Sequence, residues 1–171
     1  MLDDAIVTRL GEVGNAWSPD PNRPPLPKQP PQIDVAYDPV AAVATSGYAT
    51  SAIDGQDDWY LYSVWQSSSA LPQSLTVDLG QVRPDVAVLD YVPRNIAQVG
   101  PSADGAITSY AISTSMDGAT FTAATSGTWD ADGKMKTAAF GPVAARYVRL
   151  DALAVSGTNA AATEIAIGAR D

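Results

Sequence analysis

The order of apolar and polar residues predicts short β-strands across most of the chain from about Pro39 onward. Over residues 75–79, Leu and Val alternate with Thr and Asp, and this spacing places one set of side chains on each face of a strand. Similar apolar patterns predict further strands over residues 86–92, 107–114, 148–152 and 165–167. Several short strands without a helical period predict an all-β protein, an antiparallel β-sandwich of the jelly-roll type.

Asp-Gly pairs separate these strands, at residues 54–55, 104–105, 117–118 and 132–133. Glycine adopts the positive φ that tight turns require, so each pair predicts a turn. The last pair belongs to Asp-Ala-Asp-Gly at 130–133, which resembles the opening of an EF-hand loop. No Glu follows at the twelfth position of that loop, and we therefore interpret this motif as a turn.

The first part of the chain has a different pattern. Residues 3–14 predict a short helix, because Ile6, Leu10 and Val13 recur at helical spacing. About three turns are marginal for an isolated helix, so we expect this segment to pack on the main domain or on a neighbouring one. Residues 18–31 contain seven prolines in fourteen positions, which favours an extended spacer over an SH3-type ligand.

These patterns predict three parts: a helical segment over 1–17 left from a preceding domain, a proline-rich linker over 18–38, and a β-sandwich over 39–171.

Composition narrows the function classes. The 171 residues include no Cys and no His, which excludes Ser-His-Asp and Cys-His nucleophiles, disulfides, thiolate redox centres and zinc sites with nitrogen and sulfur ligands. The net charge is −9 and the ten basic residues are scattered, which argues against nucleic acid or an anionic membrane as partner. Short Asp-Gly turns hold solvated carboxylates rather than the deep acid pair that glycoside hydrolysis needs. We therefore expect no catalysis.

Five blocks of sequence follow one another in an order that resembles the discoidin-like (coagulation-factor C-type) domains. The blocks are SAIDGQDDWYLYSVWQSSS, QSLTVDLGQVRPDVAVLDYVPRN, DGAITSYAISTSMDGATF, GTWDADGKMKTAAFGPVAARYVRLDAL and ATEIAIG. Within this group the chain most closely resembles the bacterial carbohydrate-binding modules of family 32, over residues 39–168. The first 38 residues resemble the tail of an α-L-fucosidase catalytic domain followed by its linker.

The resemblance implies a galactose-binding-domain-like jelly roll with one structural calcium ion and a shallow sugar site on loops at one end. Ca²⁺ takes six to eight oxygen ligands. The implied ligands are the side chains of Asp54, Ser63 and Glu164 and the carbonyl groups of Ser51, Gln56 and Thr163.

The calcium site has an alternative, in which Asp54 only forms a turn and Glu164 is a solvated strand residue. The loop between Asp54 and Ser63 is also longer than in the family, so Asp57 could replace one carbonyl ligand.

The resemblance also implies polar sugar ligands. Family members often use a His after a conserved Trp, an Arg from a Tyr-x-Pro-Arg motif and an Asn before a Gly. This chain has Gln66, Arg94 and Asp104 at these positions. Gln and Asp can still bind hydroxyl groups, but the changes weaken the expectation of galactose specificity. Arg94 is the first candidate, and in the alternative it only pairs with Asp90 or Asp104.

Aromatic candidates are less distinct. The C–H face of a pyranose stacks on an aromatic ring, and Trp59, Trp129 and Tyr48 are the candidates for such a platform. Trp59 and Trp129 could equally cap the core. Trp65 stands at the position of the family's core tryptophan, and we expect it to be buried.

Together these residues predict a non-catalytic carbohydrate-binding module of a secreted bacterial glycoside hydrolase, with α-L-fucosidase-like parentage. Such a monomeric module tethers the enzyme to a terminal galactose-like or fucose-like sugar and raises the effective substrate concentration. One alternative is a structural module that packs on its catalytic domain and binds no glycan. Discoidin-type adhesion to protein or lipid is a third interpretation, which the acidic composition disfavours.

Overall fold

The computed structural model describes residues 33–55, 63–96 and 100–170. The predicted helix of residues 1–17 and most of the predicted linker lie outside these residues. Among the described residues, no helix is long and apolar enough to cross a membrane.

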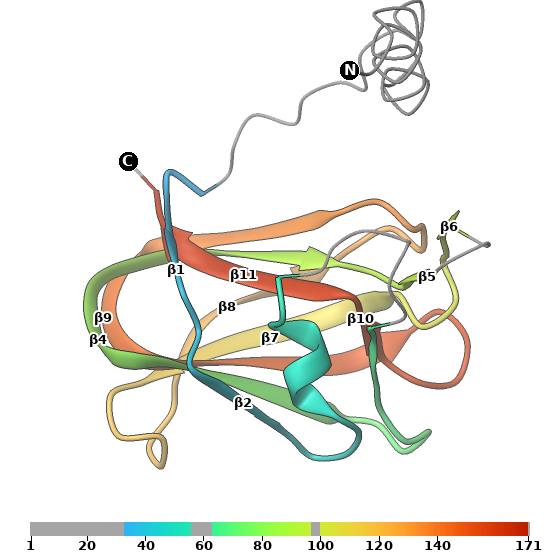
Figure 1. Cartoon of the computed structure of the whole chain (residues 1–171), viewed down its shortest axis with the longest axis horizontal. Helices are drawn as coiled ribbons and strands as arrows, with labels where there is room; N and C mark the ends of the chain where they lie inside the picture. Colours follow the sequence, from blue (N-terminus) through green and yellow to red (C-terminus); the bar gives the residue numbers. More distant parts are fainter. Residues whose placement is uncertain (1–32, 56–62, 97–99, 171) are drawn as a thin grey trace, which may run out of the picture. The chain divides into compact units, whose positions relative to one another are not determined.

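The described residues form an antiparallel β-sandwich (Figure 1), which confirms the predicted all-β fold class. Seven strands form one hydrogen-bonded sheet in the order β1-β11-β4-β9-β7-β8, with β2 paired to β4. These strands are β1 (Val35–Tyr37), β2 (Ala41–Ala44), β4 (Gln73–Val92), β7 (Ile107–Ser115), β8 (Thr122–Thr128), β9 (Lys136–Val155) and β11 (Glu164–Ala169). Smaller elements are β3 (Trp65–Gln66), β10 (Ala161–Ala162), β5 (Asn95–Ile96), β6 (Gly100–Pro101) and the 3₁₀ helix η1 (Ala49–Ala52).

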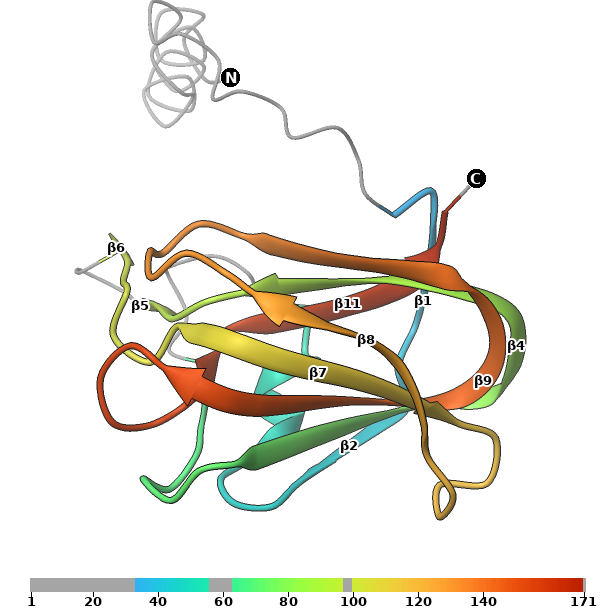
Figure 2. The same cartoon turned by 180° about the vertical axis from the view of Figure 1, so that it is seen from behind.

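Two bent strands, β4 and β9, turn this single sheet into two layers. Each has 20 residues, and their pairing shifts register several times between Asp78 and Val88. The first half of β4 pairs with β2 and the end of β9, while its second half pairs with β11 and the start of β9. Figures 1 and 2 show both strands passing from one layer to the other at the same end of the domain.

The core lies between these layers. Buried side chains alternate along the first half of β4 and the end of β9, whereas residues 86–91 of β4 are all buried. Each large side chain contributes about 1.5–3 kcal/mol by leaving water. The largest fully buried side chains include Trp65, Leu75, Leu79, Leu89, Tyr91, Ile107, Ile112, Leu150 and Ile165. Burial raises the pKa of the Tyr91 hydroxyl, which donates a hydrogen bond to the Ala161 carbonyl at 2.6 Å.

Local features agree with the predicted turns in most places. Gly55, Gly105 and Gly118 have the positive φ expected of Asp-Gly turns. Gly133 is not among the glycines with positive φ, and what requires glycine there is space, since a Cβ would lie 2.7 Å from the Ser102 nitrogen. Strand β1 pairs with β11, so regular structure begins within the range 18–38 that the sequence assigned to the linker.

Candidate functional site

Arg94 and Asp104 meet at the end of the sandwich where β4 finishes. Arg94 follows β4 by two residues, and its carbonyl oxygen accepts the Ser102 N–H at 2.8 Å. Its Nη1 lies 3.1 Å from Oδ2 of Asp104, with side-chain exposures of 18% and 65%. An exposed single-contact ion pair adds at most about 1 kcal/mol of stability. It does present a guanidinium donor and a carboxylate acceptor side by side, the groups that sugar hydroxyls bind.

The structure distinguishes between Asp90 and Asp104, the two carboxylates considered as partners of Arg94. Arg94 pairs with Asp104, whereas Asp90 accepts the hydroxyl of Thr137 at 2.5 Å. Asp90 is buried, and this desolvation raises the pKa of its carboxyl group. Asp90 therefore belongs to the sheet and not to the exposed site.

Gln66 and Tyr48 are linked to the same end through backbone contacts. Gln66 pairs with Ala161 between β3 and β10, and the Ala161 N–H binds the carbonyl of Gly105, the neighbour of Asp104. Gly47, with φ of 80°, lies so close to β3 that a Cβ would be 2.2 Å from the Gln66 carbonyl oxygen. Tyr48 follows directly and is 84% exposed. This connected framework carries four of the six predicted sugar ligands.

The predicted aromatic platform is divided. Trp65 is 1% exposed and its indole N–H binds the Ser46 carbonyl at 2.8 Å, which confirms its expected place in the core. Trp129 is partly buried and stacks on Tyr110 and Tyr91 with centroid distances of 3.8 and 5.3 Å. These contacts favour the interpretation in which Trp129 caps the core. Trp59 lies outside the described residues.

A further ion pair, between Lys136 and Asp132, lies next to the segment that contacts Arg94. Lys136 has a buried side chain, and its ammonium group contacts the Asp132 carboxylate and lowers the pKa of that group. The Asp132–Gly133 turn packs against Pro101 and Ser102, and Ser102 binds Arg94. The sequence did not predict the Lys136–Asp132 ion pair, because residues 130–136 have only the pattern of an ordinary turn followed by a strand.

The residues implied as calcium ligands also lie together where they are described. The Ser63 hydroxyl donates to Asp54 Oδ2 in a short contact, and it lies 3.5 Å from the Ser51 carbonyl oxygen. The Gly55 N–H binds Oε2 of Glu164 at 3.2 Å. Thr163 is fully buried, and its hydroxyl accepts the Asn95 N–H at 2.8 Å. Gln56 lies outside the described residues.

This donor set suits a hard cation. It consists of two carboxylates, a hydroxyl and a backbone carbonyl, all oxygen donors of the kind that Ca²⁺ prefers. Among the described residues, no group of three or more acidic side chains gathers in a way that could hold a metal ion. A cation here would therefore depend on the hydroxyl and carbonyl oxygens as well as on the two carboxylates.

Known proteins share this architecture. The family model of the F5/8 type C domain matches residues 39–166. A solved Clostridium perfringens module, CpGH89CBM32-5 in complex with GalNAc-β-1,3-galactose, is 32% identical, with a TM-score of 0.70 over 79% of this chain and 100% of that one. The family 32 module of NanJ from the same organism, solved with galactose, is 31% identical, with a TM-score of 0.66 over 77% and 96% of the two chains.

A third structure broadens the range of ligands among these neighbours. The CBM32 of AlyQ, solved in complex with 4,5-unsaturated mannuronic acid, is 26% identical and has a TM-score of 0.64 over 78% of this chain and 97% of that chain. Neighbours with this fold therefore bind neutral and acidic sugars.

Proposed function

Since the chain belongs to the F5/8 type C domain family, we propose that it is a non-catalytic carbohydrate-binding module. In this proposal the loop end with Arg94 and Asp104 binds a terminal galactose-like or fucose-like sugar and tethers a secreted glycoside hydrolase to its glycan. Tethering raises the local concentration of substrate without chemistry at the module. A shallow site buries little surface, so we expect a dissociation constant of about 0.1–1 mM for one sugar unit.

The observation that supports this proposal is the ion pair between partly buried Arg94 and exposed Asp104. It is joined through the backbone to Gln66, in a fold shared with a module solved with galactose. A guanidinium and a carboxylate can bind neighbouring hydroxyls as donor and acceptor. Tyr48 is exposed and follows Gly47, which lies against the Gln66 backbone, so its ring is a candidate aromatic surface for the sugar.

The experiment is calorimetric titration of the full chain with galactose, fucose and GalNAc-β-1,3-galactose. Arg94→Ala removes a charged hydrogen bond worth about 1.5–3 kcal/mol, so we expect at least about tenfold weaker binding. Arg170→Ala is the matched control, because Arg170 is exposed and follows β11. Binding unaffected by Arg94→Ala would overturn the site. Absence of sugar binding together with tight docking to a catalytic domain would support the purely structural role instead.

The parent enzyme is a separate part of the proposal. Resemblance of the first 38 residues to the end of an α-L-fucosidase domain supports attachment to an enzyme of that kind, in a secreted bacterial protein. The measurement is the hydrolysis of an immobilised fucosylated glycan by such a catalytic domain with and without this chain fused behind it. We expect faster hydrolysis with the chain attached, and equal rates on a soluble fucoside.

We also propose a structural calcium ion at the oxygen donors of Ser51, Asp54, Ser63 and Glu164. The close approach of Ser63 to Asp54, and of Glu164 to the Gly55 turn, supports it. The ion would neutralise two carboxylates and join the turn after η1 to the last strand.

A further inference from the structure

A groove lies on the outer face of the sheet, far from Arg94. Its volume is about 400 Å³, within the range of small-molecule sites. Strands β2, β4 and β9 form its floor, and the turn between β7 and β8 forms one wall. Its principal lining residues are Val43, Thr76, Asp78, Asp117, Phe121 and Tyr147. A second hollow of about 380 Å³ shares Asp117 on the same turn.

Strand register explains why these side chains meet. Asp78 pairs with Ala41 on one side and Tyr147 on the other, so the three side chains share one face of the sheet. The next outward row contains Val43, Thr76 and Arg149. Inward positions between these rows, such as Val77 and Val148, belong to the core. The groove is therefore built on regular strands and not only on loops.

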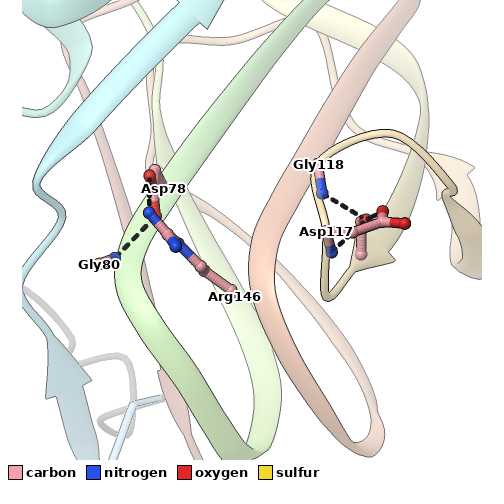
Figure 3. Close-up of polar contacts among 6 residues, drawn as sticks. Asp78, Gly80, Asp117, Gly118 and Arg146 are labelled. Atoms are coloured by element: carbon pink, nitrogen blue, oxygen red, sulfur yellow. Dashed lines mark hydrogen bonds and ion pairs between the residues drawn. The ribbon is translucent and has the colours of Figure 1, made fainter.

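Hydrogen bonds within the protein hold the polar wall in place. Arg146 binds Asp78 through Nε and Nη2 at 2.8 and 2.9 Å, as Figure 3 shows, and the Gly80 N–H binds the same carboxylate. The turn between β7 and β8 is fixed by Asp117 Oδ1, which accepts the N–H groups of Ala119 and Thr120 and the hydroxyl of Ser115. These bonds lower the pKa of Asp117 to about 2.

The apolar wall consists of different residues. Tyr147 is partly buried, with Gly118 against its ring and the Arg146 guanidinium 5.0 Å from its centroid. Val43 is 70% exposed. Phe121 is partly buried, with the Arg149 guanidinium 4.3 Å from its centroid. Val43 is therefore the most exposed of these apolar surfaces, and Phe121 and Tyr147 each present part of a ring to a ligand.

One unsatisfied polar atom, the Ser113 hydroxyl, lies next to this groove. Ser113 pairs with Arg149 in the outer row that continues from Val43 and Thr76. Arg149 Nε lies 3.3 Å from the Asp151 carboxylate and is ion-paired, whereas the Ser113 hydroxyl is buried and, among the described residues, has no hydrogen-bond partner. Buried polar groups in folded proteins are nearly always satisfied, so the Ser113 hydroxyl, which adjoins the groove without lining it, gives secondary support for a hydrogen-bonding ligand there.

We propose that this outer groove is a second sugar-binding site, which takes one neutral pyranose residue of a glycan. Hydroxyl groups would donate to the carboxylate of Asp117 and exchange hydrogen bonds with Thr76, while a C–H face rests on Val43 and Phe121. Asp117 belongs to none of the ion pairs between described residues, so the groove is acidic. An anionic sugar or a phosphate would be repelled.

The second site lies at the opposite end of the domain from the loops of Arg94. Strand β7 begins near Asp104 and ends beside Asp117, and its nine residues span about 26 Å. A glycan cannot occupy both sites with one sugar unit. Two weak sites on one rigid module would instead bind separate branches or chains, which increases avidity on a dense glycan surface.

The test is nuclear magnetic resonance titration of the isotope-labelled full chain with galactose, glucose, mannose and glucuronate. Amides of Val43, Thr76 and Gly118 report on the groove, and those of Gln66, Arg94 and Asp104 report on the loop end. We expect at least one neutral sugar to shift the groove amides saturably, and glucuronate to bind there at least about tenfold more weakly.

Val43→Arg should fill the groove and reduce its binding at least tenfold while leaving shifts at the loop end unchanged. Val35→Arg is the matched control, since Val35 is an exposed valine on edge strand β1 outside the groove. If Val43→Arg disturbs the sheet, Thr76→Arg fills the same space from β4. The proposal would be overturned if none of the three neutral sugars shifted the groove amides. Equal shifts with glucuronate, or shifts that persist in the filled variant, would also overturn it. Loop-end shifts alone would leave the first site standing and eliminate the second.

Discussion

Two arginine–carboxylate pairs in this domain differ in what they leave available. Arg146 donates hydrogen bonds from Nε and Nη2 to Asp78, which also accepts the Gly80 N–H. Two parallel bonds fix both planes, and this pair is part of the framework seen in Figure 3. Arg94 makes a single contact with Asp104, and a guanidinium carries five N–H donors. Arg94 therefore retains donors for a ligand, and the geometry of each pair matches its role.

Buried Asp90 predicts a pH dependence of stability. Burial raises its folded-state pKa above the unfolded value of about 3.9. The folded state therefore binds the proton more tightly, and stability falls as pH rises from the unfolded pKa through the raised folded one. Asp90→Asn removes this loss. The melting temperature of Asp90→Asn minus that of wild type should be higher at pH 7 than at about pH 3.5.

Thermal melts of both proteins across this pH range measure the difference. Asp130→Asn is the control, because Asp130 is exposed in a turn and should show no such trend. A constant difference between Asp90→Asn and wild type at every pH would contradict the assignment of Asp90 as a desolvated carboxyl group.

At the scale of elements, the bend of β4 depends on Gly80. Its φ of 76° is unfavourable for other residues, and a Cβ there would lie 2.9 Å from the Val40 side chain. Gly80→Ala should therefore lower the free energy of unfolding by about 1–2 kcal/mol from the backbone alone, with more from the contact. Denaturant unfolding followed by fluorescence measures this loss.

The bend in β9 supplies a matched control. Gly141 has nothing within 4 Å of the Cβ position, so Gly141→Ala should change stability little or increase it slightly. Val40→Ala combined with Gly80→Ala should restore only the part of the loss that comes from the contact. Equal effects of the two glycine substitutions would show that the left-handed φ at Gly80 does not matter.

Some elements could be read from the sequence and others could not, for physical reasons. Alternating Leu and Val at 75–79 predicted the first half of β4, because one face of that segment is buried. Its continuation through residues 80–85 was not predicted, since an exposed bend leaves no apolar pattern. Strand β8, with the sequence TAATSGT, is mostly exposed at the edge of the sheet. It offers neither apolar alternation nor large β-forming side chains.

The candidate site divides in the same way. Arg94, Asp104 and Gln66 were predicted from the resemblance to the discoidin-like family, because they stand where its motifs place polar sugar ligands, and this prediction needs no knowledge of packing. The orientation of the Trp129 side chain was not predicted, since it depends on the rings of Tyr91 and Tyr110, which are distant in sequence. The groove near Asp117 depends on register between β2, β4 and β9, which a single sequence does not reveal.

At the scale of the whole molecule, the proposed calcium ion joins segments that are distant in sequence. Ser51 lies within η1 and Asp54 follows it, Ser63 precedes β3, and Glu164 begins the last strand. A ligand that binds only the folded state stabilises it, by about 2.7 kcal/mol at one hundred times its dissociation constant. The chain has no disulfide to do this.

Chelation should therefore lower the melting temperature of the full chain, by about 10 °C for a domain of this size, and calcium but not magnesium should restore it. Glu164→Gln removes one charged ligand while preserving shape, so the difference between calcium and chelator should shrink. Asp130→Asn should keep the full difference, because its carboxylate is not among the ligands. Calorimetry with metal analysis makes the measurement. A melting temperature indifferent to chelation, in protein without bound calcium, would mean that the short contact between Ser63 and Asp54 closes the turn without a metal.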